Sequence, residues 1–97
     1  MRNFINVFDY NNNQRNGFKT AQDVRADIIG ELEAIIQYEN HITSSDNQKA
    51  IQTWSEIVNE EKIHVGELFA LLFTLDPSSR EMFEKGMNEF HNEGWIV

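Results

Sequence analysis

The sequence predicts an all-α protein made of two long antiparallel helices and one short C-terminal helix. Apolar residues recur every three or four positions through two long stretches of the chain, as one face of an amphipathic helix requires. A short polar segment at residues 43–46 separates these stretches, and the only proline, Pro77, follows the second. No stretch alternates between apolar and polar residues as a half-buried strand would.

Residues 1–18 are expected to form a flexible N-terminal arm. The segment 11–17 is rich in asparagine, ends in glycine and has no helical or strand period. Apolar residues precede it and would suit docking on a partner, although a loose terminus is an equally good interpretation. They are Phe4, Ile5, Val7, Phe8 and Tyr10.

The hairpin of two helices is expected to occupy residues 19–76. Its first helix runs from about residue 20 to 43, where Thr20 and Asp23 resemble a capping box. Its second helix runs from about 47 to 75, with Ser45 or Asp46 as the N-cap. A connection this short makes the two helices antiparallel neighbours.

The C-terminal helix and tail are expected at residues 77–97. Asp76 suits a cap, and Pro77 suits the first position of a helix, where its missing N–H is not needed. The helix should extend to about residue 92. One of its faces is apolar, with Met82, Phe83, Met87 and Phe90.

Composition narrows the classes of function. The 97 residues include 16 acidic and 8 basic ones, for a net charge of -8, which argues against nucleic acid as a partner. There is no cysteine, so any metal ligands must be carboxylates or imidazoles. The first ten residues show neither a leader peptide nor a membrane span, so a cytoplasmic location is expected, including the inside of a larger container there.

Three polar residues interrupt the apolar stripes in a pattern typical of a metal site. Glu61 and His64 lie one turn apart on the second helix, and Glu31 lies in the stripe of the first. The turn centres near residue 46, so Glu31 and Glu61 each lie fifteen residues, or roughly 20 Å, from it. The three side chains should therefore converge at one level of the hairpin.

The three predicted ligands are half of the set that holds two metal ions in four-helix bundles. Four-helix bundles with two metal ions use one glutamate from each of two helices and a Glu-x-x-His pair from each of the other two. Two hairpins related by a twofold axis would supply that set. The sequence therefore predicts a site that is complete only when two copies meet. Carboxylate and imidazole ligands suit iron or manganese, and also zinc.

These residues carry a resemblance to a known family. The stretch Glu31-Leu32-Glu33-Ala34 followed by Tyr38, with Glu60-Glu61-Lys62-Ile63-His64 further on, resembles the encapsulated ferritins, which are short ferritin-like ferroxidases housed in encapsulin nanocompartments. The resemblance covers about residues 24–75 and includes the thirty-residue spacing of the two ligand glutamates.

The resemblance implies a fold, an activity and partners. The chain would be half of a ferritin-like four-helix bundle completed by dimerisation, in a decameric ring with an encapsulin shell as partner and no membrane. A di-iron centre would oxidise Fe(II) to Fe(III), in iron storage or detoxification. Glu31, Glu61 and His64 would be the metal ligands, with Glu61 bridging, and Tyr38 would lie beside the centre.

Two departures from the family pattern bear on these expectations. The family often carries an outer acidic pair where metal is first captured; Glu33 matches one member, but Gly30 occupies the position of the other. Metal capture is therefore expected to be weaker or rearranged. No clear shell-loading peptide follows the third helix.

Two other functions remain open on the sequence alone. One is a non-catalytic bundle that binds manganese or zinc, and the other is a helical interaction module in which a buried Glu–His pair sets the helix register. Tyr38 is equally well explained as a core tyrosine with a satisfied hydroxyl. His41 and His91 lie off the apolar stripes and are expected to face solvent.

Overall fold

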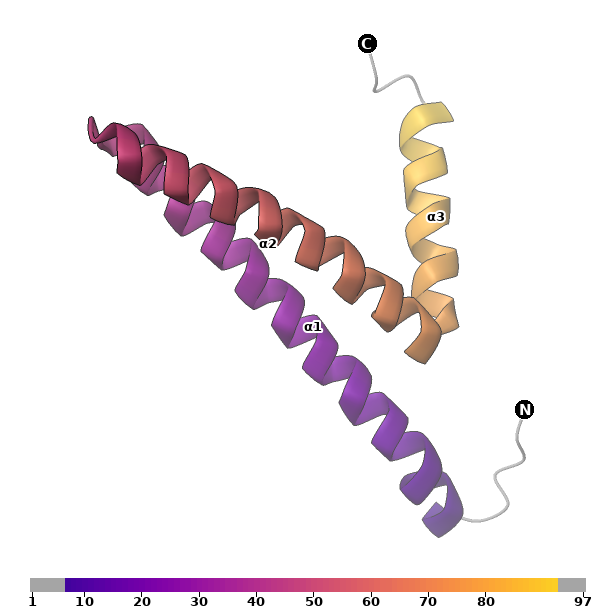
Figure 1. The fold of residues 1–97 in the computed structure, drawn as a ribbon. Helices are drawn as coiled ribbons and strands as arrows, with labels where there is room; N and C mark the ends of the chain where they lie inside the picture. The colour runs from indigo at the N-terminus through magenta and orange to yellow at the C-terminus, as the bar shows by residue number, and fades with distance from the viewer. Residues whose placement is uncertain (1–6, 93–97) are drawn as a thin grey trace.

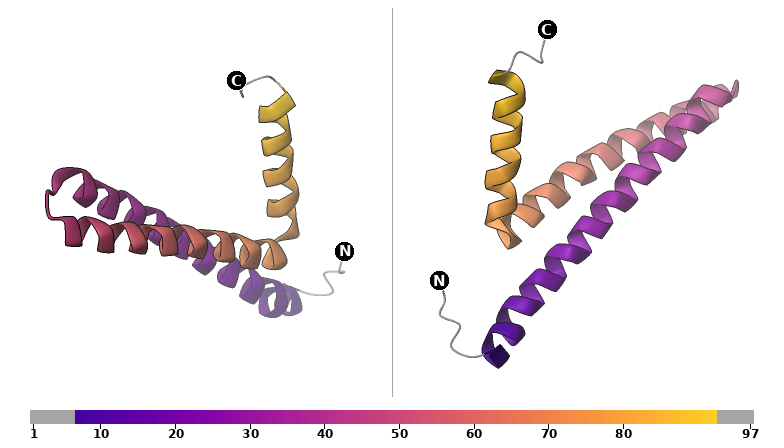
Figure 2. Two further views of the ribbon diagram at one scale, coloured as in Figure 1. Left: turned by 45° about the horizontal axis from the view of Figure 1, so that its top comes forward. Right: turned by 180° about the vertical axis from the view of Figure 1, so that it is seen from behind.

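The chain forms a long antiparallel helical hairpin from which a third helix projects. In the computed structural model, which describes residues 7–92, helix α1 spans Val7–Ser44, α2 spans Gln48–Leu75 and α3 spans Pro77–Asn92. Figure 1 shows α1 and α2 lying side by side, with α3 turning away at the far end of α2. The two further views in Figure 2 show the same arrangement. The predicted helical hairpin with a short third helix is therefore confirmed.

Helix α1 begins earlier than the sequence predicted. It starts at Val7 rather than near Thr20, so residues 7–18 of the expected arm are helical, while residues 1–6 lie outside the described part of the chain. The asparagines that suggested a turn each disfavour a helix by only a few tenths of a kcal/mol, up to about 0.7, and no proline interrupts them. Thr20 therefore lies within the helix and does not cap it. Asp23 instead pairs with Lys19, one turn earlier, at 3.0 Å.

The turn between the long helices uses a cap that differs from the predicted one. Asn47, rather than Ser45 or Asp46, is the N-cap of α2, and its side-chain oxygen accepts a hydrogen bond from the Ala50 N–H at 2.9 Å. The Ser45 hydroxyl supports it by accepting from the Asn47 N–H at 3.1 Å. Both polar side chains satisfy backbone groups that a tight turn leaves free.

The buried core is small and lies between the two long helices. Few residues are buried, and no large side chain in the described part of the chain is completely enclosed. They are Ala21, Val24, Ile28, Val58 and Leu72. A single hairpin has too little volume to bury a larger core, so further apolar residues stay exposed on its surface.

The junction between α2 and α3 is held by a polar cluster centred on Asp76. The carboxylate accepts hydrogen bonds from the hydroxyls of Ser78 at 2.9 Å and Ser79 at 2.6 Å, and it pairs with Arg25 of α1 at 2.6 Å. These hydrogen bonds, led by those of the two serines, lower the pKa of Asp76 to about 2. The predicted cap at Asp76 is confirmed, and Arg25 ties it to the first helix.

Candidate metal centre

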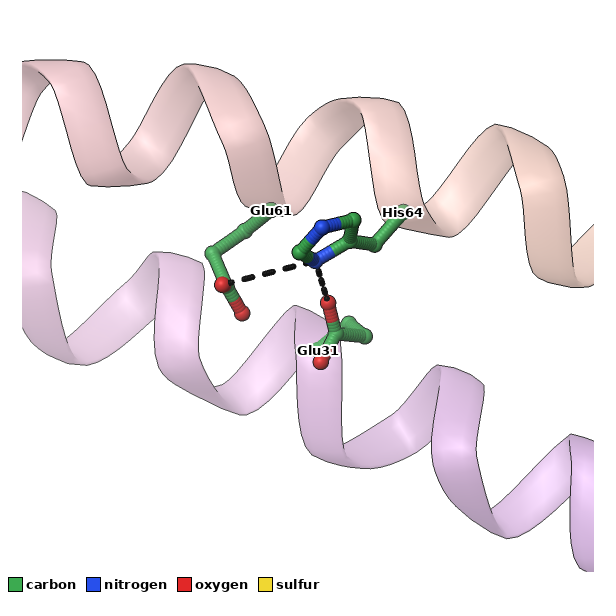
Figure 3. A group of neighbouring side chains, drawn as sticks. All are labelled: Glu31, Glu61 and His64. Carbon is green, nitrogen blue, oxygen red and sulfur yellow. Dashed lines mark hydrogen bonds and ion pairs between the residues drawn. The ribbon is translucent and has the colours of Figure 1, made fainter.

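Three potential metal ligands converge between the long helices, as Figure 3 shows. Glu61 and His64 project from successive turns of α2, and Glu31 faces them from α1. His64 Nδ1 lies 2.8 Å from Glu31 Oε1 and 3.6 Å from Glu61 Oε1. One ligand atom from each residue lies within 4.8 Å of the other two. The structure thus brings together the three residues that counting from the turn had paired.

The two carboxylates crowd one another at this level of the hairpin. Burial, reinforced by the negative charge of Glu31 and a hydrogen bond to it, raises the pKa of Glu61 above its ordinary value. The hydrogen bond to Glu31 raises the pKa of His64 as well. Negative charge held close to an imidazole in this way favours a bound cation, whether that cation is a proton or a metal ion.

The site is covered on one side and open on the other. The Glu61 side chain is 16% exposed and that of Glu31 25%, whereas His64 is 48% exposed. His64 borders a surface groove of about 680 Å³ that runs along both long helices. A metal ion held by these three residues would therefore still have coordination positions available to solvent or to further ligands.

The wall of this groove contains two acidic residues that were not among the predicted site residues. Asp27 lies one turn before Glu31 on α1, and Glu67 lies one turn after His64 on α2. The same spacing of three or four residues that located the ligands could have located these neighbours. Gly30 lines the same groove as Asp27 and Glu67, and a Cβ added to Gly30 would meet no atom within 4 Å.

Of the outer acidic pair that the resemblance implies, the one matching residue is Glu33, and Glu33 does not line the groove. Glu33 is exposed and is two residues from Glu31, which places it on another side of α1. The groove beside Gly30 is instead bordered by Asp27 and Glu67. The expectation that metal capture is rearranged stays a prediction, and it now refers to a defined surface.

Tyr38 lies two turns beyond Glu31 and outside the three-residue cluster. It is half-buried, and its ring meets that of His41 edge-on with centroids 6.1 Å apart. The role proposed for Tyr38 beside the metal stays a prediction.

One expectation about the histidines is wrong. His41 is half-buried, because its ring packs against Trp54 of α2 at a centroid distance of 5.0 Å. The apolar stripe of α1 is wider near the turn than the sequence pattern indicated, so a residue at its border is covered. His91 is exposed on α3, as expected.

Exposed apolar side chains lie beside the open side of the site. Ile63, which is 62% exposed, and Leu71, which is 46% exposed, line the grooves that His64 borders. Exposed apolar residues gathered around a polar site are typical of a surface that another protein covers. Within the described part of the chain, no helix is both long and apolar enough to cross a bilayer.

Comparisons with known proteins identify similar chains. A solved crystal structure, that of the encapsulated ferritin domain from Pyrococcus furiosus, matches with a TM-score of 0.79 and 32% identity, covering 82% of this chain and 82% of that one. In sequence, a ferritin-like–encapsulin shell fusion protein from Pyrococcus furiosus is 38% identical over 66 residues, which are 68% of this chain and 19% of that protein.

A second sequence relative is the encapsulin nanocompartment cargo protein EncC from Myxococcus xanthus. It is 33% identical over 69 residues, which are 67% of this chain and 53% of that protein. The chain thus spans about a fifth of the fusion protein and about half of the cargo protein. No protein-family model matches it.

Proposed function

Because the chain belongs to the encapsulated ferritin family, we propose that it is a ferroxidase, oxidising Fe(II) to Fe(III) at a di-iron centre shared between two copies. The observation that carries this proposal is the convergence of Glu31, Glu61 and His64 within 4.8 Å of one another. Carboxylate oxygens and one imidazole nitrogen form a donor set suited to iron.

The half-set of ligands supports a shared centre. Two copies of the cluster would supply four carboxylates and two imidazoles, which is the inventory of di-iron carboxylate bundles. The open side at His64 and the exposed residues Ile63 and Leu71 beside it give a second copy a partly apolar surface to cover. Covering this surface would exclude water around the metals and strengthen their electrostatic binding.

Each ligand has a distinct role in this proposal. Glu61, the most buried of the three, would bridge the two metal ions, while Glu31 and His64 would each complete the coordination of one. Two Fe(II) ions each release one electron, and O₂ with two protons accepts both to give hydrogen peroxide. The chain's part is to hold the two substrate ions together and leave oxidant access open.

Metal binding would also favour the pairing of copies. The chain carries a net charge of -8, and two clusters of carboxylates would repel one another when brought face to face. Two divalent cations between them offset that repulsion. The oligomer is therefore expected to depend on metal. A ring of ten copies stays a prediction from the family resemblance.

We also propose that the chain associates with an encapsulin shell. One relative is a fusion of a ferritin-like domain with an encapsulin shell, and another is an encapsulin cargo protein. We place this chain inside an encapsulin nanocompartment within the cytoplasm, where oxidised iron would be stored. The groove beside the site is open to the surface and could not enclose a mineral, which supports storage outside the subunit.

The test is anaerobic loading with Fe(II) followed by exposure to O₂, with the absorbance of ferric product measured over time. Rapid oxidation that Glu61→Ala abolishes supports the ferroxidase. Glu60→Ala is the matched control, because Glu60 is the neighbouring carboxylate on α2 but is exposed and outside the cluster. That variant should oxidise iron at the original rate.

Other results of this experiment would indicate a different function for the three-residue cluster. Tight binding of Mn(II) or Zn(II) without oxidation of Fe(II) would indicate a non-catalytic metal-binding bundle. Absence of metal binding in an intact oligomer would indicate an interaction module in which the Glu–His contact only sets helix pairing. Equal oxidation rates in Glu61→Ala and Glu60→Ala would contradict the proposed centre.

A further inference from the structure

Three aromatic side chains form a cluster between the long helices, on the turn side of the metal centre. Tyr38 and His41 belong to α1 and Trp54 belongs to α2, and all three are half-buried. The rings of Tyr38 and His41 meet edge-on with centroids 6.1 Å apart, and the His41 ring lies 5.0 Å from the ring of Trp54. This aromatic cluster therefore connects a phenol to an indole across the hairpin through one imidazole.

The aromatic cluster lies close to the metal ligands. Tyr38 follows Glu31 by seven residues on α1, and Trp54 precedes Glu61 by seven residues on α2. Seven residues are almost two helical turns, so the phenol and the indole lie on the same sides of their helices as the ligands, roughly 10 Å nearer the turn. Figure 1 shows α1 and α2 side by side over this part of the hairpin. Electrons cross separations of this size between side chains in proteins.

The proposed ferroxidase reaction produces an oxidant that the aromatic cluster can reduce. The inference rests on that reaction, in which O₂ becomes hydrogen peroxide beside Fe(II). A further Fe(II) ion gives peroxide one electron, which breaks the O–O bond and leaves Fe(III), hydroxide and a hydroxyl radical. The hydroxyl radical becomes water when it takes one more electron and one proton. In a chain without cysteine, phenols and indoles are the side chains that supply them most readily.

We propose that Trp54 and Tyr38 supply this electron and proton, so that peroxide is reduced to water without release of a hydroxyl radical. An indole can lose an electron before its proton, whereas a phenol loses both together, so Trp54 is the first donor. Tyr38 then replaces the electron of Trp54 through the ring of His41 and releases its phenolic proton. Fe(II), peroxide and the phenol thus become Fe(III), hydroxide, water and a tyrosyl radical.

The tyrosyl radical is removed by the substrate of the same reaction. Another Fe(II) ion gives Tyr38 one electron and becomes Fe(III), and a proton from solvent restores the phenol. Tyr38 is only half-buried, so solvent reaches its side chain. The complete cycle oxidises two Fe(II) ions with one peroxide and leaves the chain unchanged.

His41 acts as a positioning residue in this cycle. Its ring contacts both of the other rings and connects them, but it donates no electron. An aromatic ring in its place should preserve the connection between Trp54 and Tyr38, and a small aliphatic side chain should break it. Packing alone would produce the same contacts but no radical.

Electron paramagnetic resonance tests the proposal, because the chain has a matched residue for each donor. Tyr10 and Trp95 are its only other tyrosine and tryptophan. Hydrogen peroxide is added to the chain loaded anaerobically with Fe(II), and the sample is frozen rapidly. A tyrosyl signal should appear, and Tyr38→Phe and Trp54→Phe should each remove it. Tyr10→Phe and Trp95→Phe should retain it.

Two results of this measurement would overturn the proposal. One is the absence of a tyrosyl signal from the original chain, and the other is a signal that persists in Tyr38→Phe or in Trp54→Phe. His41 is tested in the same way, with helicity checked by circular dichroism. His41→Ala should weaken the signal and His41→Phe should preserve it, and equal signals in these two variants would contradict the route through the imidazole.

A spin trap for hydroxyl radicals gives an independent measurement. Trp54→Phe should release more trapped radical than Trp95→Phe, and equal amounts would overturn the proposal. Because peroxide is supplied directly, this result is separate from the test of the ferroxidase. A chain that oxidises Fe(II) with O₂ but forms no tyrosyl radical would refute only the role of the aromatic cluster. A tyrosyl radical formed with peroxide, without oxidation of Fe(II) by O₂, would refute only the ferroxidase.

Discussion

His64 and Glu31 lie thirty-three residues apart in the chain, yet Nδ1 of the histidine is 2.8 Å from Oε1 of the glutamate. The contact joins α1 to α2 at the level where Glu61 also turns inward. An imidazole between two carboxylates is a position that either a proton or a metal ion can stabilise. A proton and a metal ion therefore compete for this position.

Replacing the clustered histidine should reduce metal binding and iron oxidation. His64→Ala removes the only nitrogen ligand of the cluster, and the loss should be at least about tenfold, since even groups that only orient a metal ligand cost that much. His91→Ala is the matched control, because His91 is exposed on α3. His41 is less suitable because it packs on Trp54. Equal losses in His64→Ala and His91→Ala would mean that the cluster does not bind the metal.

The protonation of His64 should report its contact with Glu31. The hydrogen bond raises the pKa of His64 in the metal-free protein. Glu31→Gln removes the negative charge, so an NMR titration should show the pKa of His64 lower in that variant. Glu33→Gln, on another side of α1, should leave the titration unchanged. A pKa of His64 that is the same in all three proteins would exclude the observed contact in solution.

Metal binding should weaken as pH falls through the pKa of His64. A proton and a metal ion compete for the same imidazole nitrogen, so the raised pKa moves the loss of affinity to higher pH than an isolated histidine would. Titration with Mn(II) at several pH values measures this shift. In Glu31→Gln the loss of metal affinity should occur at lower pH than in the original chain. The metal affinity at neutral pH should also fall, because one ligand is changed.

Asp76 should contribute to stability at neutral pH and lose that contribution in acid. Its pKa is about 2 in the folded chain, below the ordinary value of 3.8. A lowered folded-state pKa stabilises the fold above the unfolded pKa, and the effect disappears as pH falls from about 4 to about 2. Asp76→Asn should therefore flatten the acid limb of a plot of unfolding free energy against pH. An acid limb unchanged by the substitution would show that the Asp76 cluster does not form in solution.

The buried and exposed leucines of α2 offer a test of the packing. Leu72 is 5% exposed within the core, whereas its neighbour Leu71 is 46% exposed. Leu72→Ala should lower the free energy of unfolding by about 2–4 kcal/mol, the usual cost of a cavity in a core. Leu71→Ala should cost less. Denaturant unfolding at a fixed protein concentration measures both, and a larger loss for Leu71 would show that assembly covers that residue.

The order of the helices and the register of the hairpin could be predicted from the sequence, because the residues that end and begin helices lie where the helices pack against one another. The Asp76-Pro77 pair located the boundary between α2 and α3, and the hairpin register followed from the turn near residue 46. That register was sufficient to bring Glu31 to the level of Glu61 and His64. Helical rise is regular, so counting residues is an accurate guide to height along a straight hairpin.

The features that counting missed depend on context beyond the local pattern. The start of α1 at Val7 crosses a segment of poor helix formers, which a helix already nucleated downstream can include. Burial of His41 depends on Trp54 across the hairpin. The contacts of Arg25 with the α2–α3 junction join positions more than fifty residues apart. Periodicity within one helix contains no information about such pairings.

The central claim is that the metal centre needs two copies of the chain. Native mass spectrometry of the protein loaded anaerobically with Fe(II) tests it most directly, since it reports the number of chains and of metal ions in each species. We expect iron only in species with two or more chains, at one iron per chain, and we expect Glu61→Ala to remove both the iron and the metal-dependent pairing. A monomer that holds iron and oxidises it on exposure to O₂ would show that one copy of the chain is sufficient.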